Sequence, residues 1–248
     1  MDERLMNAML ELDDRHWWYR GRRRIVRAEL DRLPLRAGAR VLDAGCGSGR
    51  TLDELSPYGE VSGIELDPGA AELARGRGRG DVVVGRLEEL PWEDGSFDLI
   101  TCLDVIEHTP DDRVTLQELR RVSRPGGFLL VTVPAYQGLW SMHDVANHHY
   151  RHYSRGMMRA AAGEAGWRIV RMTSFNGLLL GPAAAVRLAE RRREPDADYK
   201  PELKLGPDWL NSLLEQPLRL EARWLASGRT MPAGLSLLAV LENPGELA

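Results

Sequence analysis

Short apolar runs alternate along the chain with segments whose apolar residues recur every three or four positions. This alternation begins near residue 39 and is typical of βα units that build a mostly parallel sheet. Runs such as FDLITCL and GFLLVTV are almost entirely apolar, as expected for strands covered on both faces. The pattern predicts strands at residues 40–43, 60–65, 81–84, 97–103, 128–133, 167–173 and 234–243. We therefore predict an α/β fold with a doubly wound sheet.

Helix signals fill most of the segments between these strands. The predicted helices cover residues 51–56, 68–75, 112–122, 155–165, 176–193 and 209–227. Pro68 suits the first turn of a helix, and Pro110-Asp111 precedes apolar residues at helical spacing. We expect a polar, histidine-rich loop at residues 135–153 and a Pro- and charge-rich linker at residues 194–207.

Composition limits the classes of protein that fit. The 248 residues are 43% apolar and 28% charged, which predicts one domain with additions. A net charge of −4 gives no general attraction to nucleic acid, and we interpret the five arginines at residues 20–27 as a solvated helix face. Cys46 and Cys102 suggest neither a disulfide framework nor a zinc site, and no stretch approaches the roughly 18 apolar residues of a membrane span. We expect a cytoplasmic protein with no membrane span and no nucleic-acid partner.

The strongest chemical signal is the turn after the first strand, in VLDAGCGSGR. The turn contains Gly45, Gly47 and Gly49. These glycines let the backbone turn sharply and approach a ligand that a Cβ would obstruct. Asp43 can reach the turn or a cationic amino group of a ligand, and Glu65, at the end of the next strand, can accept from both ribose hydroxyls. A dinucleotide-binding enzyme would need glycine at the position of Arg50, so this alternative is disfavoured.

Five segments together resemble class I S-adenosylmethionine-dependent methyltransferases of the methyltransferase type 11 kind. They are VLDAGCGSGR, SGIELDP, GRLEELPWEDGSFDLI, DVIEH and RVSRPGGFLLVTVP. The resemblance covers residues 37–134, and GLSLLAVLEN is similar to the antiparallel last strand of the family. It implies a Rossmann-like sheet of seven strands with the last antiparallel. The methyltransferase domain would then occupy residues 37–248, behind an N-terminal helical lid at residues 1–36.

The resemblance also implies S-adenosylmethionine as the cofactor. Its methionine part would lie at the glycine turn, its ribose at Glu65 and its adenine near Leu66 and Leu87. The lid would contact the methionine carboxylate through Tyr19 or an arginine. The family usually has an acid at position 86, and Arg86 has no acceptor, so backbone groups are expected to recognise the adenine. The predicted cofactor-binding residues are Asp43, Gly45, Cys46, Gly47, Gly49, Glu65, Leu66, Leu87, Leu103, Tyr19 and Arg23.

Methyl transfer needs a well-positioned acceptor and, where the acceptor arrives protonated, a base. The fourth strand runs into DVIEH, whose His108 can act as a base near neutral pH. Four of the six histidines lie in HDVANHHYRHYS, at residues 143–154, which we predict to be a wall of the acceptor pocket. The predicted catalytic residues are Asp104, His108, His149 and Tyr153.

A divalent metal is an alternative at the same place. Asp104, Glu107 and His108 form D-x-x-E-H, which is similar to the metal-binding E-x-x-E-H of small-RNA 2′-O-methyltransferases. His149 or His148 could add a ligand. The ion would bind the acceptor hydroxyl, orient it and lower its pKa. The sequence leaves both a metal and a direct base at His108 open.

These inferences predict an enzyme that transfers a methyl group to a small-molecule acceptor, with oxygen favoured over nitrogen or carbon. The rival is a non-catalytic S-adenosylmethionine-binding partner subunit, against which His108 and the histidine-rich loop speak. A long connection separates the last two strands, and we predict that residues 175–229 form a helical insertion that covers the acceptor side or joins two subunits of a homodimer. Its apolar part, residues 175–189, is interpreted as a cap helix, a dimer contact or a helix at a membrane interface.

Overall fold

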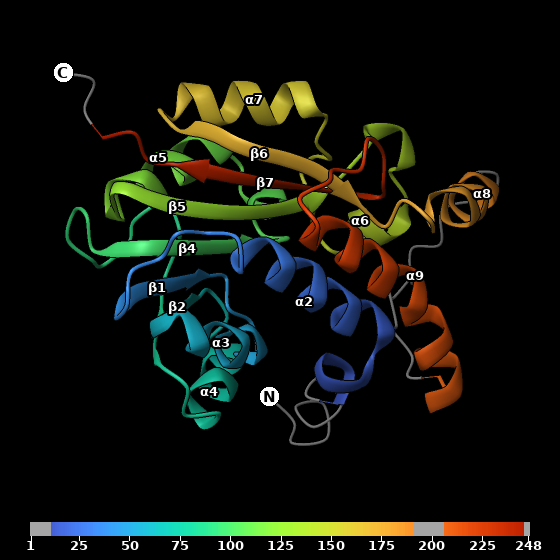
Figure 1. The fold of residues 1–248 in the computed structure, drawn as a ribbon, viewed down its shortest axis with the longest axis horizontal. Coiled ribbons are helices and arrows are strands. Elements are labelled where there is room, and N and C mark those ends of the chain that lie inside the picture. The colour runs from blue at the N-terminus through green and yellow to red at the C-terminus, as the bar shows by residue number, and fades with distance from the viewer. Residues whose placement is uncertain (1–10, 191–205, 246–248) are drawn as a thin grey trace.

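A seven-stranded sheet runs through the centre of the computed structural model, which describes residues 11–190 and 206–245 (Figure 1). The strands are β1 (Ala39–Ala44), β2 (Gly59–Glu65), β3 (Asp81–Val84), β4 (Phe97–Leu103), β5 (Ser123–Pro134), β6 (Arg168–Phe175) and β7 (Ser236–Glu242). Their order is β3-β2-β1-β4-β5-β7-β6, and β7 is antiparallel to both of its neighbours. The predicted seven-stranded sheet with an antiparallel last strand is confirmed, although β5 begins at Ser123 and not at residue 128.

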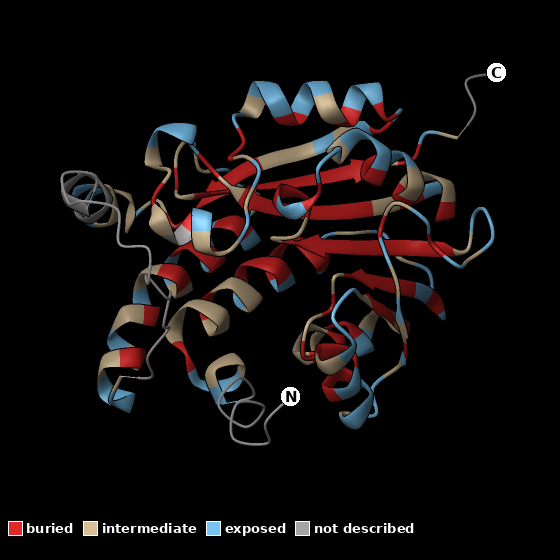
Figure 2. Cartoon of the chain, turned by 180° about the vertical axis from the view of Figure 1, so that it is seen from behind, coloured by how far each residue is buried: buried red, intermediate tan, exposed pale blue. Residues whose placement is uncertain are grey.

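Two groups of helices cover the two faces of the sheet. One face packs on α5 (Asp112–Val122) and α7 (Arg155–Glu164), and the other on α2 (Trp17–Leu30), α3 (Arg50–Leu55), α4 (Pro68–Gly76) and α9 (Asp208–Ala226). Viewed from behind, the central strands are buried while the helices alternate between buried and exposed residues (Figure 2). This is the layered arrangement that near-continuous apolar strands require.

Local signals explain where these helices begin. The Asp111 side chain accepts from the amides of Arg113 and Val114 and so caps α5, and Asp67 caps α4 directly before Pro68. The predicted loop at residues 135–153 contains two short helices, η3 (Gln137–Leu139) and α6 (Met142–Ala146). Shorter 3-10 turns also occur at η1 (Ser56–Tyr58) and η2 (Ile106–His108).

Helix α9 packs directly on α2, although 177 residues separate the end of α2 at Leu30 from the beginning of α9 at Asp208. A Cβ added to Gly21 of α2 would lie 2.1 Å from Leu218 Cδ1 of α9, so the backbones are in close contact. The buried Glu215 accepts from Arg20, Arg24 and Arg219 at 2.7 to 2.9 Å. Helix α2 of the predicted lid and helix α9 of the predicted insertion are therefore packed together.

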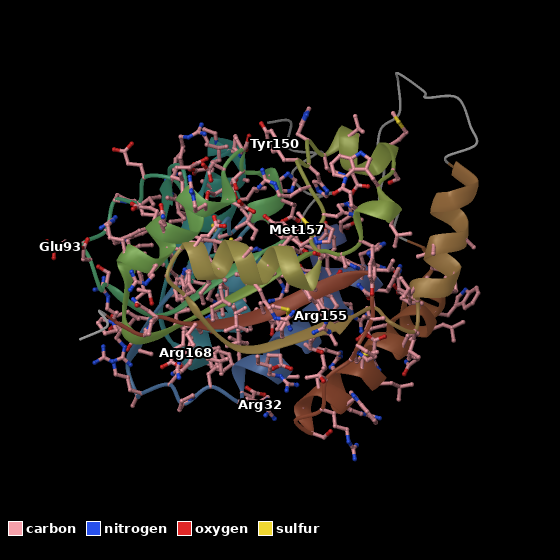
Figure 3. The ribbon with its side chains drawn as sticks, turned by 90° about the horizontal axis from the view of Figure 1, so that it is seen from above. Arg32, Glu93, Tyr150, Arg155, Met157 and Arg168 are labelled. Atoms are coloured by element: carbon pink, nitrogen blue, oxygen red, sulfur yellow. The ribbon has the colours of Figure 1, made fainter. Side chains whose placement is uncertain are left out.

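The rest of the insertion is α8 (Leu180–Glu190), which projects from the same end of the molecule as α9 (Figures 1 and 3). The end of the helix predicted at 176–193 and most of the predicted linker at 194–207 lie outside the described residues. No helix in the described ranges is long and apolar enough to cross a membrane. Cys46 and Cys102 are both free thiols and both buried.

Candidate functional site

The glycine turn leaves β1 and enters α3 through left-handed backbone. Gly47 has φ 54° and Gly49 has φ 81°, conformations that favour glycine. The two glycines differ in their surroundings. A Cβ at Gly49 would lie 2.7 Å from Ala74 Cα of α4, whereas a Cβ at Gly47 would meet nothing within 4 Å. Gly49 therefore permits close packing of α3 on α4, and Gly47 keeps space open in front of the turn.

A cavity of about 240 Å³ lies in front of this turn, at the carboxyl ends of β1 and β4. Its lining consists of Leu12, Asp13, Tyr19, Arg22, Arg23, Asp43, Gly45, Cys46, Gly47, Ser48, Arg50, Thr51 and Leu103. Seven of the residues predicted to bind the cofactor are in this set, namely Tyr19, Arg23, Asp43, Gly45, Cys46, Gly47 and Leu103. A crevice at the switch point beside the first strand is where open α/β sheets bind ligands.

Asp43 is the buried acid of this cavity. Its Oδ1 accepts from the Thr101 hydroxyl at 2.7 Å, whereas its Oδ2 is buried and has no hydrogen-bond partner among the described residues. Burial raises the pKa of Asp43 to about 6, against the opposing effects of Thr101 and Arg22. A buried carboxylate oxygen without a partner is costly unless a ligand supplies a donor, and a cationic amino group would do so.

The lid side of the cavity is formed by α2, which contributes Tyr19, Arg22 and Arg23. Arg22 was not among the predicted residues, yet its Nη1 donates to Asp104 Oδ2 at 2.5 Å and its guanidinium lies 5.0 Å from the Trp18 ring centroid. Burial acts to lower the pKa of Arg22, but Asp104 raises it, so the cation is firmly held. The spacing of Tyr19, Arg22 and Arg23 by three and four positions on one helix was the available signal.

The residues predicted at the ribose and adenine lie beyond this cavity. Glu65 Oε2 accepts from the Gly47 amide at 2.9 Å, and Oε1 accepts from the Asp67 amide at 3.0 Å. Glu65 thus ties the end of β2 to the glycine turn, and each oxygen keeps a second lone pair for another donor. Leu66 is 62% exposed, whereas Leu87 is buried in the core.

A second group of side chains gathers after β4. The Tyr150 amide donates to the Glu107 carbonyl at 2.7 Å and fixes the histidine-rich loop against η2; Tyr150 is labelled in Figure 3. The rings of His108 and His149 then lie edge to face, with their centroids 4.5 Å apart. The structure therefore brings together two histidines that are 41 residues apart in sequence.

Asp144 holds the histidine-rich loop together through hydrogen bonds to three residues. Its Oδ1 lies 3.0 Å from Nδ1 of His149 and 2.7 Å from Nε2 of the buried His152, and its Oδ2 accepts from the Ser141 amide at 2.7 Å. Burial acts to raise the pKa of Asp144, but the hydrogen bonds from both histidines hold it far below its usual range. An anionic Asp144 favours the His149 tautomer with its proton on Nδ1, which leaves the lone pair on Nε2.

His108 and Glu107 belong to the same group of side chains, and the pKa of each is shifted from its usual range. Burial and the neighbouring His149 lower the pKa of His108, so its imidazole is neutral near pH 7 and can accept a proton. Glu107 is almost fully buried, and its Oε2 has no hydrogen-bond partner in the described part of the chain. Burial, with the charge of Asp104, raises the pKa of Glu107 well above its usual range.

Glu107, His108 and His149 could hold a divalent ion, because their ligand atoms all lie within 4.8 Å of one another. Two imidazoles and one carboxylate, with Asp144 hydrogen-bonded behind one imidazole, form a donor set suited to a transition-metal ion. Asp104, which the sequence placed in this group, is not part of it, because its carboxylate pairs with Arg22.

Two other residues predicted for this site, His148 and Tyr153, are not among the possible metal ligands Glu107, His108 and His149. His148 is exposed and is not part of the group. Tyr153 is a buried core residue, and its hydroxyl donates to Asp112 Oδ2 at 2.6 Å. A catalytic role for Tyr153 stays a prediction, and its observed contacts stabilise the fold.

Known proteins are similar to this chain in sequence and fold. A family described as "Methyltransferase domain" matches residues 42–131. An uncharacterized 37.1 kDa protein in transposon TN4556 of Streptomyces fradiae is 31% identical over 212 residues, which are 76% of this chain and 61% of that protein. The ubiquinone biosynthesis O-methyltransferase of Xanthomonas oryzae pv. oryzae is 38% identical over 103 residues, which are 39% of this chain and 43% of that protein. One solved chain, from a complex containing the Trm112 methyltransferase activator of Haloferax volcanii, matches with a TM-score of 0.65 at 21% identity, over 99% of this chain and 97% of that chain.

Strand order, the glycine turn and the family match together define the class of protein. Residues 42–131 match the methyltransferase domain family, and the sheet around them has the topology of the class I S-adenosylmethionine-dependent methyltransferases. The chain spans 61% and 43% of the lengths of the two curated relatives described above, so their substrates do not transfer to this chain by similarity alone.

Proposed function

We propose that this protein transfers a methyl group from S-adenosylmethionine to a small-molecule acceptor. The observation that supports the proposal most is the unpaired buried oxygen of Asp43, a residue that lines the cavity in front of Gly47. A cofactor with a cationic amino group would supply the missing donor, and Arg22 or Arg23 could bind its carboxylate. The residues present therefore fit S-adenosylmethionine, which supplies an activated methyl group when bound.

The neighbouring histidines give the protein a means to handle the acceptor. The His108 imidazole is neutral near pH 7 and can accept a proton, and Asp144 orients the ring of His149 beside it. Either ring could remove the proton of an acceptor hydroxyl, which favours oxygen over nitrogen or carbon as the acceptor atom. Alternatively, a divalent ion on Glu107, His108 and His149 would lower the pKa of that hydroxyl and make a separate base unnecessary.

The rival function is a cofactor-binding subunit without catalysis of its own. One structural neighbour comes from a complex with a methyltransferase activator. A cofactor-binding subunit would likewise act together with a protein partner. Asp144 orients His149, which lies against His108, and this arrangement favours an enzyme. A non-catalytic subunit does not require an oriented imidazole.

The proposal is tested by following S-adenosylhomocysteine release from the purified chain with panels of hydroxylated, amine and carbon-acid acceptors. We expect acceptor-dependent release that is largest for a hydroxylated compound. Cofactor binding without release, under every acceptor and with added divalent ions, would instead identify the non-catalytic subunit. Absence of cofactor binding would contradict both functions.

The pKa of Asp43 predicts how cofactor affinity depends on pH. Burial raises this pKa to about 6, so Asp43 is neutral below pH 6 and anionic above it. Only the anion attracts a cationic amino group, and affinity should therefore increase as pH rises through 6. We expect S-adenosylhomocysteine to bind about tenfold more weakly at pH 5 than at pH 7.5, measured by titration calorimetry. Asp43→Asn should bind weakly at both pH values, and a wild-type affinity that does not change with pH would contradict the role of Asp43.

A further inference from the structure

Helix α9 is apolar on two opposite faces. Its inner face packs against α2 and the sheet through buried residues that include Leu218, Ala222 and Leu225. Its outer face exposes Trp209 (68%), Leu213 (59%), Leu220 (55%) and Trp224 (47%), which we call the outer stripe. Exposed apolar residues that gather on one side of a helix mark a surface for interaction with a partner. The outer stripe is therefore a surface that a partner would cover.

The outer stripe follows one side of the helix. Its members are spaced by four, seven and four residues, which places them on one side of the helix, with Gln216 near the middle. Trp224 is held in place, because its Nε1 donates to the Thr230 carbonyl at 3.3 Å and the Arg229 guanidinium lies 4.5 Å from its ring centroid. Tryptophans that are rigid before binding contribute strongly to protein interfaces.

The outer stripe has the same order of residue types whether it is followed from the N-terminal or from the C-terminal end of α9. Along the helix it is Trp, Leu, Leu, Trp, and the midpoint of both the tryptophan pair and the leucine pair falls between Gln216 and Pro217. A second copy of α9 laid antiparallel about a two-fold axis at this midpoint would place Trp209 against Trp224 and Leu213 against Leu220. Isologous dimer interfaces require this kind of self-complementarity.

We propose that this chain forms a two-fold symmetric homodimer through the outer stripes of two antiparallel α9 helices. Two tryptophans and two leucines from each copy would form the apolar centre of an interface of roughly 800 Å² per subunit, and the polar residues around them would form its rim. Gln216 would meet its own copy at the axis, where a polar residue fixes the register of paired helices. Because α9 also packs on the lid helix α2, the dimer would stabilise the lid over the cofactor cavity.

Site-specific cross-linking tests the axis directly. Gln216→Cys introduces an exposed thiol, and the two native cysteines are buried, so a disulfide under mild oxidation must join the two introduced thiols. The matched control is Ala226→Cys on the same helix, which is also exposed but would lie about 28 Å from its copy in the dimer. We expect a cross-linked dimer for position 216 and a monomer for position 226, since a disulfide needs Cα atoms within about 7 Å. Equal cross-linking at both positions would overturn the antiparallel register.

Sedimentation measurements test the apolar contact. We expect the wild-type chain to have twice its sequence mass, and Leu220→Glu to raise the dimer dissociation constant about a hundredfold or more. Met157→Glu changes an exposed apolar residue (43%) on α7, which covers the opposite face of the sheet from α9, and should leave the dimer intact. A monomeric wild-type chain would overturn the proposal. If that monomer also binds vesicles containing anionic lipid, and Leu220→Glu does not, the outer stripe is a membrane contact instead.

Discussion

Gly47→Val is expected to reduce the affinity for S-adenosylhomocysteine by at least a hundredfold while the protein stays folded. Gly47 lines the cavity, and a side chain there would enter the space that the cofactor is proposed to occupy. The same substitution also strains the backbone, because Gly47 has φ 54°. That strain costs about 1 to 2 kcal/mol, which should lower the melting temperature by about 2 to 8 °C. Titration calorimetry measures the affinity and circular dichroism the melting temperature.

Two other glycines provide controls for this experiment. Gly126 also has a left-handed φ (77°) and open space around its missing Cβ, but it lies at the beginning of β5. Gly126→Val should therefore lose similar stability and keep normal affinity. Gly49→Val should lose much more stability, because its Cβ would press on the backbone of Ala74. Normal binding by Gly47→Val, or equal loss of binding by Gly126→Val, would show that the glycine turn has only a structural role.

The sheet and the glycine turn could be predicted because each depends on residues close together in sequence. Apolar runs define buried strands whatever their neighbours are, and the turn needs glycine at fixed positions because of its own backbone geometry. The order of β7 between β5 and β6 is not visible in such local patterns. The resemblance of GLSLLAVLEN to the last strand of the family predicts only that this strand is antiparallel, and its position between β5 and β6 comes from the structure.

The side-chain partners in the site were less predictable, because they are set by long-range packing. Asp104 belongs to a motif that resembles a metal site. Its carboxylate nevertheless pairs with Arg22 of α2, which lies 82 positions earlier in the sequence. Its backbone is also left-handed, with φ 58°, a conformation that local sequence does not specify for an aspartate. The sequence places Asp144 only in a polar, histidine-rich loop. In the structure its Oδ1 contacts both His149 and His152, so Asp144 connects the histidines of that loop.

His149→Ala is expected to lower turnover by roughly a hundredfold to ten-thousandfold, which is the contribution of a lost general base or of an equally important metal ligand. Asp144→Asn should lower it through His149, because the amide cannot hold the ring in the tautomer with its lone pair on Nε2. As a positioning residue, Asp144 should change kcat and the pH profile and leave cofactor affinity unchanged. The profile should rise with pH and level off at a lower pH than an ordinary histidine would give, because burial and His149 lower the pKa of His108.

Glu107→Gln separates a metal-assisted mechanism from a direct base. Burial raises the pKa of Glu107 well above its usual range, which favours the protonated carboxyl group, and glutamine resembles that form in shape and charge. Without a metal, Glu107→Gln should then keep nearly full turnover, and EDTA should have no effect. If Glu107, His108 and His149 bind a divalent ion, the ion holds Glu107 in its anionic form, and both EDTA and Glu107→Gln should abolish turnover. Mg²⁺, Mn²⁺ or Zn²⁺ should restore the EDTA-treated wild type but not the variant. Full turnover in His108→Ala, His149→Ala and Glu107→Gln would mean that catalysis rests on positioning of the acceptor alone.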